Sequence, residues 1–419
     1  MIVDRREYIE QLRRSKGNGL IKIVTGLRRS GKSFLLKKLF RQDLINDGVS
    51  EDHILIIDME SRKYKNFRNP DYLLDWVDSK VVDSDTYYII IDEVQEVNEF
   101  IEVLSTLSVT EGVDVYVTGS NSRFLSSDVV TEFRGRGDEI HVWPLTFAEF
   151  MSVYEGSKEE GLVEYLMFGG LPQLLTQDGD EKKTSFLLGL YQTVYLRDIF
   201  ERNRIDLKAE FEELSKTLSS SVGAPVNARN IANTFKSVSN VQNITDKTVS
   251  MYLGYMQDAY LIEKSERFDI KGRKYIGNLC KYYYQDIGLR NAIISFRQVE
   301  HTHLMENVIY NEMRMRGWLV DVGNIIQRTT KEGVQQRVTL EIDFVCNKGS
   351  ERIYIQSAWR MPDSEKMEQE KRSLRIVNDS FRKILVVGEH TKPWKDEYGI
   401  QILSIYDFLL KPELTEGKL

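Results

Sequence analysis

The chain has 419 residues, which is long for one domain and predicts roughly two to four domains. Its hydrophobic content of 41% and charged content of 29% are typical of a globular protein in water. No apolar run has the length of a membrane span and the polar N-terminus is unlike a signal peptide, so we expect no membrane partner and a cytoplasmic location. Two cysteines, Cys280 and Cys346, offer neither a disulfide framework nor the spacing of metal ligands. A net charge of −7 argues against a protein that coats nucleic acid but leaves room for a local basic face.

The most specific motif follows an apolar run at residues 20–25 and precedes a leucine-rich helical pattern. It reads Gly-Leu-Arg-Arg-Ser-Gly-Lys-Ser over residues 26–33, the spacing of a phosphate-binding loop between a strand and a helix. Its glycines let backbone N–H groups close around a phosphate, and the helix N-terminus adds partial positive charge. An ordinary glycine turn would not require the Lys-Ser pair. The candidate nucleotide-binding residues are Gly26, Leu27, Arg28, Arg29, Ser30, Gly31, Lys32, Ser33 and Phe34.

Two carboxylates close a second apolar strand pattern at residues 87–91. We expect Asp92 to hold Mg²⁺ together with the Ser33 hydroxyl, Lys32 to reach the β- and γ-phosphates, and Glu93 to orient the attacking water. An Asp-Glu pair at the end of a strand is common on protein surfaces. Because this pair follows a phosphate-binding loop at a typical distance, it predicts a hydrolytic site for ATP and Mg²⁺.

A further strand pattern at residues 113–118 ends just before Ser120 and Asn121. Strands that alternate with helices predict the α/β class with the parallel sheet of a P-loop NTPase, whose ligands lie at the carboxyl ends of the strands. Ser120 and Asn121 are therefore expected beside Asp92 and Glu93, where a short polar side chain can hold the lytic water or contact the γ-phosphate. The alternative is that both residues only cap a loop.

Taken in order, these motifs resemble a prokaryotic family of AAA-type ATPases. That family joins an N-terminal AAA (P-loop) domain to a winged helix and a PD-(D/E)XK nuclease-like domain of unknown function. The resemblance rests on residues 26–33, 89–93, 118–122, 133–136 and 144–150, and it extends to Gly-Gly-Leu-Pro at 169–172 and to 195–199.

The resemblance makes Arg136, with Arg134 beside it, the candidate arginine finger. Such a residue neutralises transition-state charge and often acts across a subunit interface, in which case a homo-oligomer would be required. A surface salt bridge is the alternative. Arg197 in the helical region is a weaker candidate for sensing nucleotide, since helical arginines mostly pair on surfaces.

The predicted domains are an AAA-type ATPase domain over residues 1–150, a helical lid or linker over 151–205, a winged helix over 206–279 and a degenerate nuclease-like domain over 280–419.

The winged-helix pattern consists of three helical segments followed by a strand. Thr245 is the predicted N-cap of the third helix. If that helix is a recognition helix, Lys247, Thr248 and Ser250 face the DNA groove. The wing then contacts phosphates through Arg267, Lys271, Arg273 and Lys274. Winged helices also connect proteins, so a protein–protein spacer is the alternative.

The last part of the chain resembles the PD-(D/E)XK nuclease fold at residues 305–312, 341–345 and 354–358. In an active member, a helix acid, a strand acid and an acid-x-Lys pair gather a divalent metal. The matching positions carry Glu306, Asp343 and Gln356, and the lysine position falls on Ala358.

The departures from the nuclease pattern weaken the expected metal site. Glutamine lacks a charge, and alanine cannot stabilise a charged transition state. We expect Glu341 to point to the other face of its strand, so that it does not substitute for Asp343. The sequence therefore predicts a vestigial metal site without ordinary nuclease chemistry.

The predicted function is that of an AAA-type protein that hydrolyses ATP with Mg²⁺ to drive or switch a C-terminal half that binds nucleic acid or protein. The preference for ATP over GTP comes from the resemblance. One alternative is an ATP-controlled metal-dependent nuclease that uses Glu306 and Asp343. Another is a nucleotide-switched DNA-binding or scaffold protein with little turnover.

Overall fold

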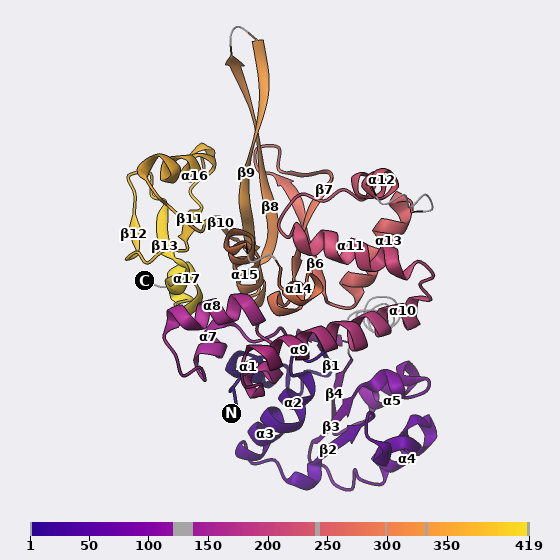
Figure 1. The fold of residues 1–419 in the computed structure, drawn as a ribbon. Helices are drawn as coiled ribbons and strands as arrows, with labels where there is room; N and C mark the ends of the chain where they lie inside the picture. The colour runs from indigo at the N-terminus through magenta and orange to yellow at the C-terminus, as the bar shows by residue number, and fades with distance from the viewer. Residues whose placement is uncertain (1, 120–136, 239–243, 298–299, 332–333, 417–419) are drawn as a thin grey trace. The chain divides into compact units, whose positions relative to one another are not determined.

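The computed structural model describes residues 2–119, 137–238, 244–297, 300–331 and 334–416, which form two compact units (Figure 1). The N-terminal unit comprises residues 1–145, 171–176 and 258–260. The C-terminal unit comprises residues 146–170, 177–257 and 261–419.

The N-terminal unit is built around a five-stranded parallel sheet with the order β2-β3-β4-β1-β5. Its strands are β1 (Ile21–Thr25), β2 (Ile54–Asp58), β3 (Tyr87–Asp92), β4 (Val113–Thr118) and β5 (Gly137–His141). Every residue of β1 and β3 is buried, as expected for central strands that are covered on both faces.

Helices cover both faces of this sheet (Figure 1). One face packs against α1 (Arg6–Ser15) and the helical run α2 (Lys32–Phe34), η1 (Leu35–Phe40) and α3 (Arg41–Asn46). The other face packs against α4 (Pro70–Asp78) and α5 (Phe100–Val109). Short helical turns complete the unit: η2 (Glu51–His53), η3 (Arg62–Arg68), η4 (Val94–Glu96) and η6 (Pro172–Thr176).

Helices also make up the first part of the C-terminal unit. They are α7 (Phe147–Met151), α8 (Lys158–Phe168), α9 (Asp180–Leu190), η7 (Tyr191–Leu196), α10 (Arg197–Asn203), α11 (Lys208–Ser220), α12 (Ala228–Val238) and α13 (Asp246–Asp258). Thr245 caps α13, since its Oγ1 accepts the Thr248 N–H at 3.1 Å, which confirms the predicted cap.

An eight-stranded mixed sheet with the order β12-β13-β11-β10-β9-β8-β6-β7 forms the rest of this unit. Its strands are β6 (Ile262–Asp269), β7 (Lys274–Tyr284), β8 (Leu319–Lys331), β9 (Val334–Lys348), β10 (Glu351–Ala358), β11 (Arg382–Val387), β12 (Trp394–Lys395) and β13 (Gln401–Ser404). The long hairpin of β8 and β9 extends beyond the other strands (Figure 1). The remaining helices are α14 (Ile287–Ile293), α15 (His301–Met315), α16 (Ser364–Ile376), α17 (Ile405–Leu410) and α18 (Glu413–Glu416).

The structure confirms the predicted α/β class and the strand patterns at residues 20–25, 87–91 and 113–118, while β5 was not predicted. The boundary predicted after residue 279 falls inside β7, and β6 pairs in parallel with β8. A single sheet therefore joins the segment read as a winged helix to the segment read as nuclease-like. The division into four domains stays a prediction.

A buried carboxylate holds Gly169 and Gly170 to α14 within the C-terminal unit. Asp286 Oδ2 accepts the Gly170 N–H at 2.8 Å, and Oδ1 accepts the Leu289 N–H at 2.9 Å at the start of α14. A Cβ at Gly169 would lie 2.5 Å from the same carboxylate, so glycine is required there. Burial raises the pKa of Asp286 to about 6, although the backbone N–H groups that it accepts oppose this shift.

We therefore expect Asp286 to make the stability of the C-terminal unit depend on pH. Because the folded pKa is raised, the folded state binds more protons than the unfolded state, and stability falls as pH rises from about 4 to 6. Relative to Asp286→Asn, the wild-type chain should lose up to about 3 kcal/mol of unfolding free energy across this range.

Urea unfolding at several pH values measures this difference. Asp363→Asn, at the exposed N-cap of α16, is the matched control for an Asp-to-Asn change at a cap. Parallel pH profiles for the wild-type chain and Asp286→Asn would contradict the assignment.

Candidate functional site

The predicted phosphate-binding loop joins β1 to α2 in the N-terminal unit. Gly26 has a φ of 128°, and a Cβ there would lie 2.1 Å from the carbonyl oxygen of Val142. Gly31 has a φ of 99°, a left-handed conformation that favours glycine. Both glycines of the motif are thus required by the backbone itself.

The side chain of Lys32 folds back over this loop. Its Nζ donates to the carbonyl oxygens of Gly26 at 2.9 Å and Leu27 at 3.0 Å. Burial lowers the pKa of Lys32 to about 8, while the nearby carboxylates of Glu93 and Asp92 oppose the shift. A buried ammonium held by neutral carbonyls is ready to exchange them for an anionic oxygen.

Asp92 at the end of β3 is the centre of the site. Its Oδ1 accepts hydrogen bonds from Ser33 Oγ at 2.9 Å and from Thr118 Oγ1 at 2.6 Å. Thr118 Oγ1 in turn accepts the backbone N–H of Glu93 at 2.9 Å. The structure thus brings the predicted residues Ser33 and Asp92 into direct contact.

Lys37 is a member of the site that the sequence analysis missed. Its Nζ lies 2.7 Å from Asp92 Oδ2 and 2.9 Å from Asp58 Oδ2, so one ammonium links the carboxylates that end β2 and β3. The signal was present, because Lys37 follows Ser33 by one helical turn and shares its helix face.

Glu93 adopts a left-handed backbone conformation, with a φ of 56°, which is uncommon for a residue with a side chain. Its carboxylate accepts a hydrogen bond from the amide of Gln95. Backbone strain of this kind occurs at functional sites more often than elsewhere.

A cavity of 380 Å³ opens at the loop within the N-terminal unit. Residues 28–33, Glu60 and Glu93 form its polar part. The sequence analysis missed its apolar part, which is lined by Ile2, Val3, Leu39, Val142, Leu145 and Leu175. The cavity is large enough for a small organic ligand, and it offers a charged end and an apolar end.

Several predicted residues lie outside the described residues, namely Ser120, Asn121, Arg134 and Arg136. Arg197 is described, and its exposed side chain pairs with Glu201 on the same helix at 2.7 Å. This is the surface pairing that the sequence analysis weighed against a role in sensing nucleotide.

The acids predicted from the nuclease resemblance lie in the C-terminal unit and surround a buried lysine. Lys281 Nζ on β7 lies 2.9 Å from Glu306 Oε1 and 2.8 Å from Glu341 Oε1. Glu306 Oε1 also accepts the Tyr283 hydroxyl at 2.7 Å. Burial lowers the Lys281 pKa, but the charges of Glu306, Asp343 and Glu341 outweigh burial and raise it. Lys281 is therefore firmly protonated, and the sequence analysis missed it.

Asp343 is held by β10. Its Oδ2 accepts the backbone N–H and the hydroxyl of Ser357, at 2.8 and 2.7 Å, and its Oδ1 accepts the Gln356 amide at 3.2 Å. Burial and the charge of Glu306 raise the pKa of Asp343 to about 7, against the opposing effects of Lys281 and Ser357. Within the described residues, one group of acidic and histidine side chains brings its ligand atoms close enough together to hold a metal, namely His53, Asp83 and Asp85. Neither Glu306 nor Asp343 belongs to this group.

The expectation that Glu341 points away from Asp343 is wrong. Side chains alternate along a strand, so residues two apart share a face, and the contact of Glu341 with Lys281 shows that this carboxylate reaches the same cluster.

Of the basic residues predicted to contact DNA, Arg267 is half-buried and its guanidinium donates to Asn324 Oδ1 at 2.8 Å, whereas the others lie at exposed positions in the C-terminal unit. Lys247 is exposed near the start of α13, and Arg273 and Lys274 are exposed where β6 turns into β7. DNA contact by these residues stays a prediction.

Two families match this chain. Residues 18–151 match the AAA domain, and residues 159–300 match a domain of unknown function (DUF8612). An uncharacterized protein of Haemophilus influenzae is 30% identical over 416 residues, which cover 98% of this chain and 99% of that protein. An uncharacterized protein of Methanocaldococcus jannaschii is 26% identical over 371 residues, which cover 86% of this chain and 79% of that protein.

Two solved structures are more distantly similar. A Walker-type ATPase of Pyrococcus abyssi has 15% identity and a TM-score of 0.49, with coverage of 70% of this chain and 96% of that chain. The ORC2 protein of Aeropyrum pernix has 11% identity and a TM-score of 0.40, with coverage of 74% and 92%. Both TM-scores are below 0.5, so neither similarity carries an argument about function.

Among the described residues, no helix combines the length and the apolar character that crossing a membrane requires.

Replacing Lys281 tests whether its ammonium stabilises the buried acids around it. Lys281→Met should destabilise the chain by about 3–5 kcal/mol, because it leaves buried carboxylates without a positive partner. Lys264→Met, which removes an exposed pair with Glu266, should cost less than about 1 kcal/mol. Urea unfolding measures both values, and equal stability of the two variants would contradict a buried ion-pair centre.

Proposed function

This chain belongs to the family of the uncharacterized Haemophilus influenzae protein, which it matches along nearly its whole length, and we propose that its AAA domain binds ATP with Mg²⁺ and hydrolyses ATP to ADP and phosphate. The observation that supports this proposal most directly is that Ser33 and Thr118 both donate hydrogen bonds to Asp92, beside the side chain of Lys32. A glycine turn without a ligand would need neither this buried carboxylate nor the buried lysine.

The phosphates are proposed to bind at the loop. Lys32 would exchange the carbonyl oxygens of Gly26 and Leu27 for the β- and γ-phosphate oxygens, and the loop N–H groups would hold the remaining charge. The apolar end of the cavity, around Val142 and Leu145, suits the adenine base.

The residues around Asp92 fit a magnesium ion. A hydroxyl and a carboxylate oxygen are the hard ligands that Mg²⁺ prefers, and Ser33 and Asp92 supply one of each at hydrogen-bonding distance. When bound, the ion neutralises phosphate charge. Lys37 already places a positive charge at Asp92, and its side chain is 24% exposed, so it has room to move away.

Glu93 is proposed to orient the attacking water. Its position directly after Asp92 and its hydrogen bond to Thr118 aim it into the cavity that Lys32 also lines. From their positions in the sequence, Ser120 and Asn121 are proposed to contact the γ-phosphate or the water. Arg136 is proposed as an arginine finger, acting either within its own chain or across a subunit interface.

The C-terminal unit is proposed to bind a partner and not to cut nucleic acid. Support comes from Lys281, whose ammonium lies among the acids that a metal-dependent nuclease would need for its ion. Lys247, Arg273 and Lys274 are the proposed DNA contacts of its winged-helix segment.

A nucleotide-controlled switch with little turnover is the second candidate. The observation that favours it is the hydrogen bond from Gln95 to Glu93, which occupies the carboxylate that would orient water. Phosphate release measured with and without DNA separates a switch from an ATPase.

Two variants test hydrolysis directly. Lys32→Ala should abolish ATP binding, and Glu93→Gln should bind ATP while phosphate release falls by a factor of about 100 or more. Glu96→Gln, an exposed carboxylate three residues away, is the matched control and should behave as the wild-type chain. Normal turnover by Glu93→Gln would remove Glu93 from the mechanism.

The pKa of Lys32 predicts proton uptake on binding. Above pH 8 the free lysine is partly neutral, and anionic phosphates favour its charged form, so ATP binding should take up close to one proton near pH 9. Affinity should then fall up to about tenfold per pH unit above 8.

Titration calorimetry in buffers of different ionisation enthalpy measures this uptake. The Lys32→Arg variant keeps its positive charge, so it should bind ATP without taking up a proton. The same proton uptake in both proteins would assign the proton to another group.

A further inference from the structure

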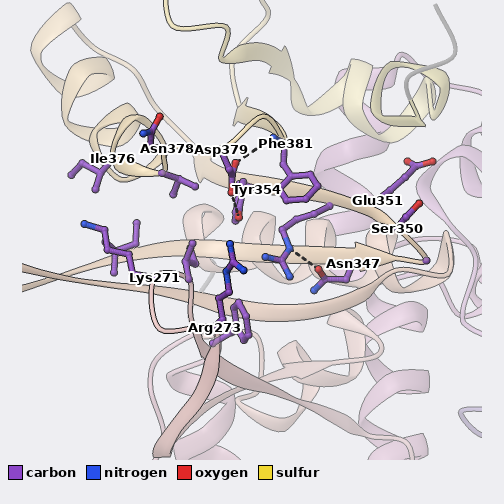
Figure 2. Close-up of a pocket in the computed structure, with 16 residues that line it drawn as sticks. Lys271, Arg273, Asn347, Ser350, Glu351, Tyr354, Ile376, Asn378, Asp379 and Phe381 are labelled. Carbon is purple, nitrogen blue, oxygen red and sulfur yellow. Dashed lines mark hydrogen bonds between the residues drawn. The ribbon is translucent and has the colours of Figure 1, made fainter.

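A second pocket, with a volume of 680 Å³, lies in the C-terminal unit. It opens between the β6–β7 turn, the β9–β10 turn and the segment from α16 to β11 (Figure 2). The residues that line it do not include those of the Lys281 cluster or of the loop at residues 26–33. Its volume is within the range of roughly 300–1,000 Å³ that is typical of ligand sites.

Two cations project from the β6–β7 turn at one side of this pocket. Lys271 and Arg273 are exposed, and within the described residues neither side chain has a hydrogen-bond or ion-pair partner. Asp269 fixes the turn, since its carboxylate accepts the Lys271 N–H at 3.1 Å. Arg273 itself has a φ of 51°, a conformation that few residues other than glycine adopt. An ammonium and a guanidinium without partners, held on one tight turn, suit phosphate oxygens.

Flat surfaces line the pocket beside these cations. The guanidinium carbon of Arg352 lies 5.3 Å from the ring centroid of Phe268 and 5.5 Å from that of Phe381. Arg352 Nε donates to Asn347 Oδ1 at 2.7 Å, which fixes the guanidinium in place (Figure 2). The side chain of Phe381 is 39% exposed, so part of its ring is free to contact a ligand. Aromatic rings and guanidinium planes are the surfaces on which unpaired bases stack.

Hydrogen-bonding groups lie across the pocket from the cations (Figure 2). The Tyr354 hydroxyl donates to Asp379 Oδ2 at 2.7 Å, and the Phe381 N–H donates to Oδ1 at 3.2 Å, so the carboxylate is fixed. A carboxylate repels phosphate but accepts N–H groups from the edge of a base. The charges therefore orient a nucleotide, with its phosphate toward Lys271 and Arg273 and its base toward Asp379.

We propose that this pocket binds one unpaired nucleotide, either free or within a single strand. The base stacks on Phe381 and Arg352, and the phosphate pairs with Lys271 and Arg273. A base in a duplex is stacked between its neighbours and does not present its face, so the pocket selects single strands over duplexes. This binding requires neither ATP hydrolysis nor the proposed duplex contact through Lys247.

Fluorescence anisotropy of the full chain with a labelled short single strand, in buffer without free nucleotide, tests the proposal. Phe381→Leu keeps the apolar volume but loses the flat ring, and it should weaken single-strand binding about tenfold while duplex binding is unchanged. Phe381→Tyr should retain binding, and an unchanged urea-unfolding profile of both variants separates stacking from folding.

The cations are tested by salt dependence. Lys271→Gln combined with Arg273→Gln should reduce the slope of log affinity against log salt by about 1.4 for a single strand. Lys182→Gln, an exposed lysine of α9, is the matched control and should leave the slope unchanged.

A nucleoside monophosphate separates the two sources of the ligand. If it competes with the strand, the site takes free nucleotides, and if it does not, the site takes nucleotides within a strand; both results support the proposal. Wild-type affinity for the strand in Phe381→Leu would overturn it. So would a wild-type chain that binds neither strand nor monophosphate, or a phosphopeptide that displaces the strand better than the monophosphate does. The strand affinity of Lys32→Ala should equal that of the wild-type chain, so failure of the proposed ATPase and failure of this site are distinguishable.

Discussion

The carboxylate of Asp92 is the group on which the N-terminal site depends. Three elements meet at it, because β3 carries the carboxylate, the helix after the loop carries Ser33 and Lys37, and β4 carries Thr118. Asp92 is only 1% exposed, and a charge so poorly solvated is stable only while its donors remain. The parallel sheet makes this meeting possible, since its strands end at one edge and β4 lies between β1 and β3.

Much of this arrangement was predictable, because its signals are local in the sequence. The strand runs are continuous apolar stretches, and the loop between β1 and α2 has a spacing that only a few backbone conformations satisfy. The structure gives that spacing a physical reason at Gly26, where any Cβ would collide with the carbonyl of Val142. Thr245 is a similar case, since an N-cap is set by the residues that directly follow it.

The residues that were missed make contacts between distant parts of the chain. Lys281 reaches Glu306 and Glu341 only because β7, α15 and β9 pack together, and no local pattern marks such a lysine. The apolar end of the N-terminal cavity likewise joins Ile2 to Leu175. Glu341 differs from these cases, because strand alternation alone places it on the same face as Asp343. The winged-helix and nuclease-like segments stay predictions, since one sheet runs through both.

The site in each unit pairs a lysine with carboxylates: Lys37 with Asp92 in the N-terminal unit, and Lys281 with Glu306 and Glu341 in the C-terminal unit. The two lysines differ in how exposed their side chains are. The side chain of Lys37 is 24% exposed, so water can solvate its ammonium once a magnesium ion takes its place at Asp92. The side chain of Lys281 is only 5% exposed, and the charges of three acids raise its pKa. If another cation took its place among these acids, the Lys281 ammonium would be left buried without a partner, at a high cost in free energy. In the proposed ATPase cycle the first carboxylate would exchange its cation for magnesium, while the second keeps its lysine as part of the folded structure. This contrast is consistent with the proposal that metal-dependent chemistry belongs to the N-terminal unit and ligand binding to the C-terminal unit.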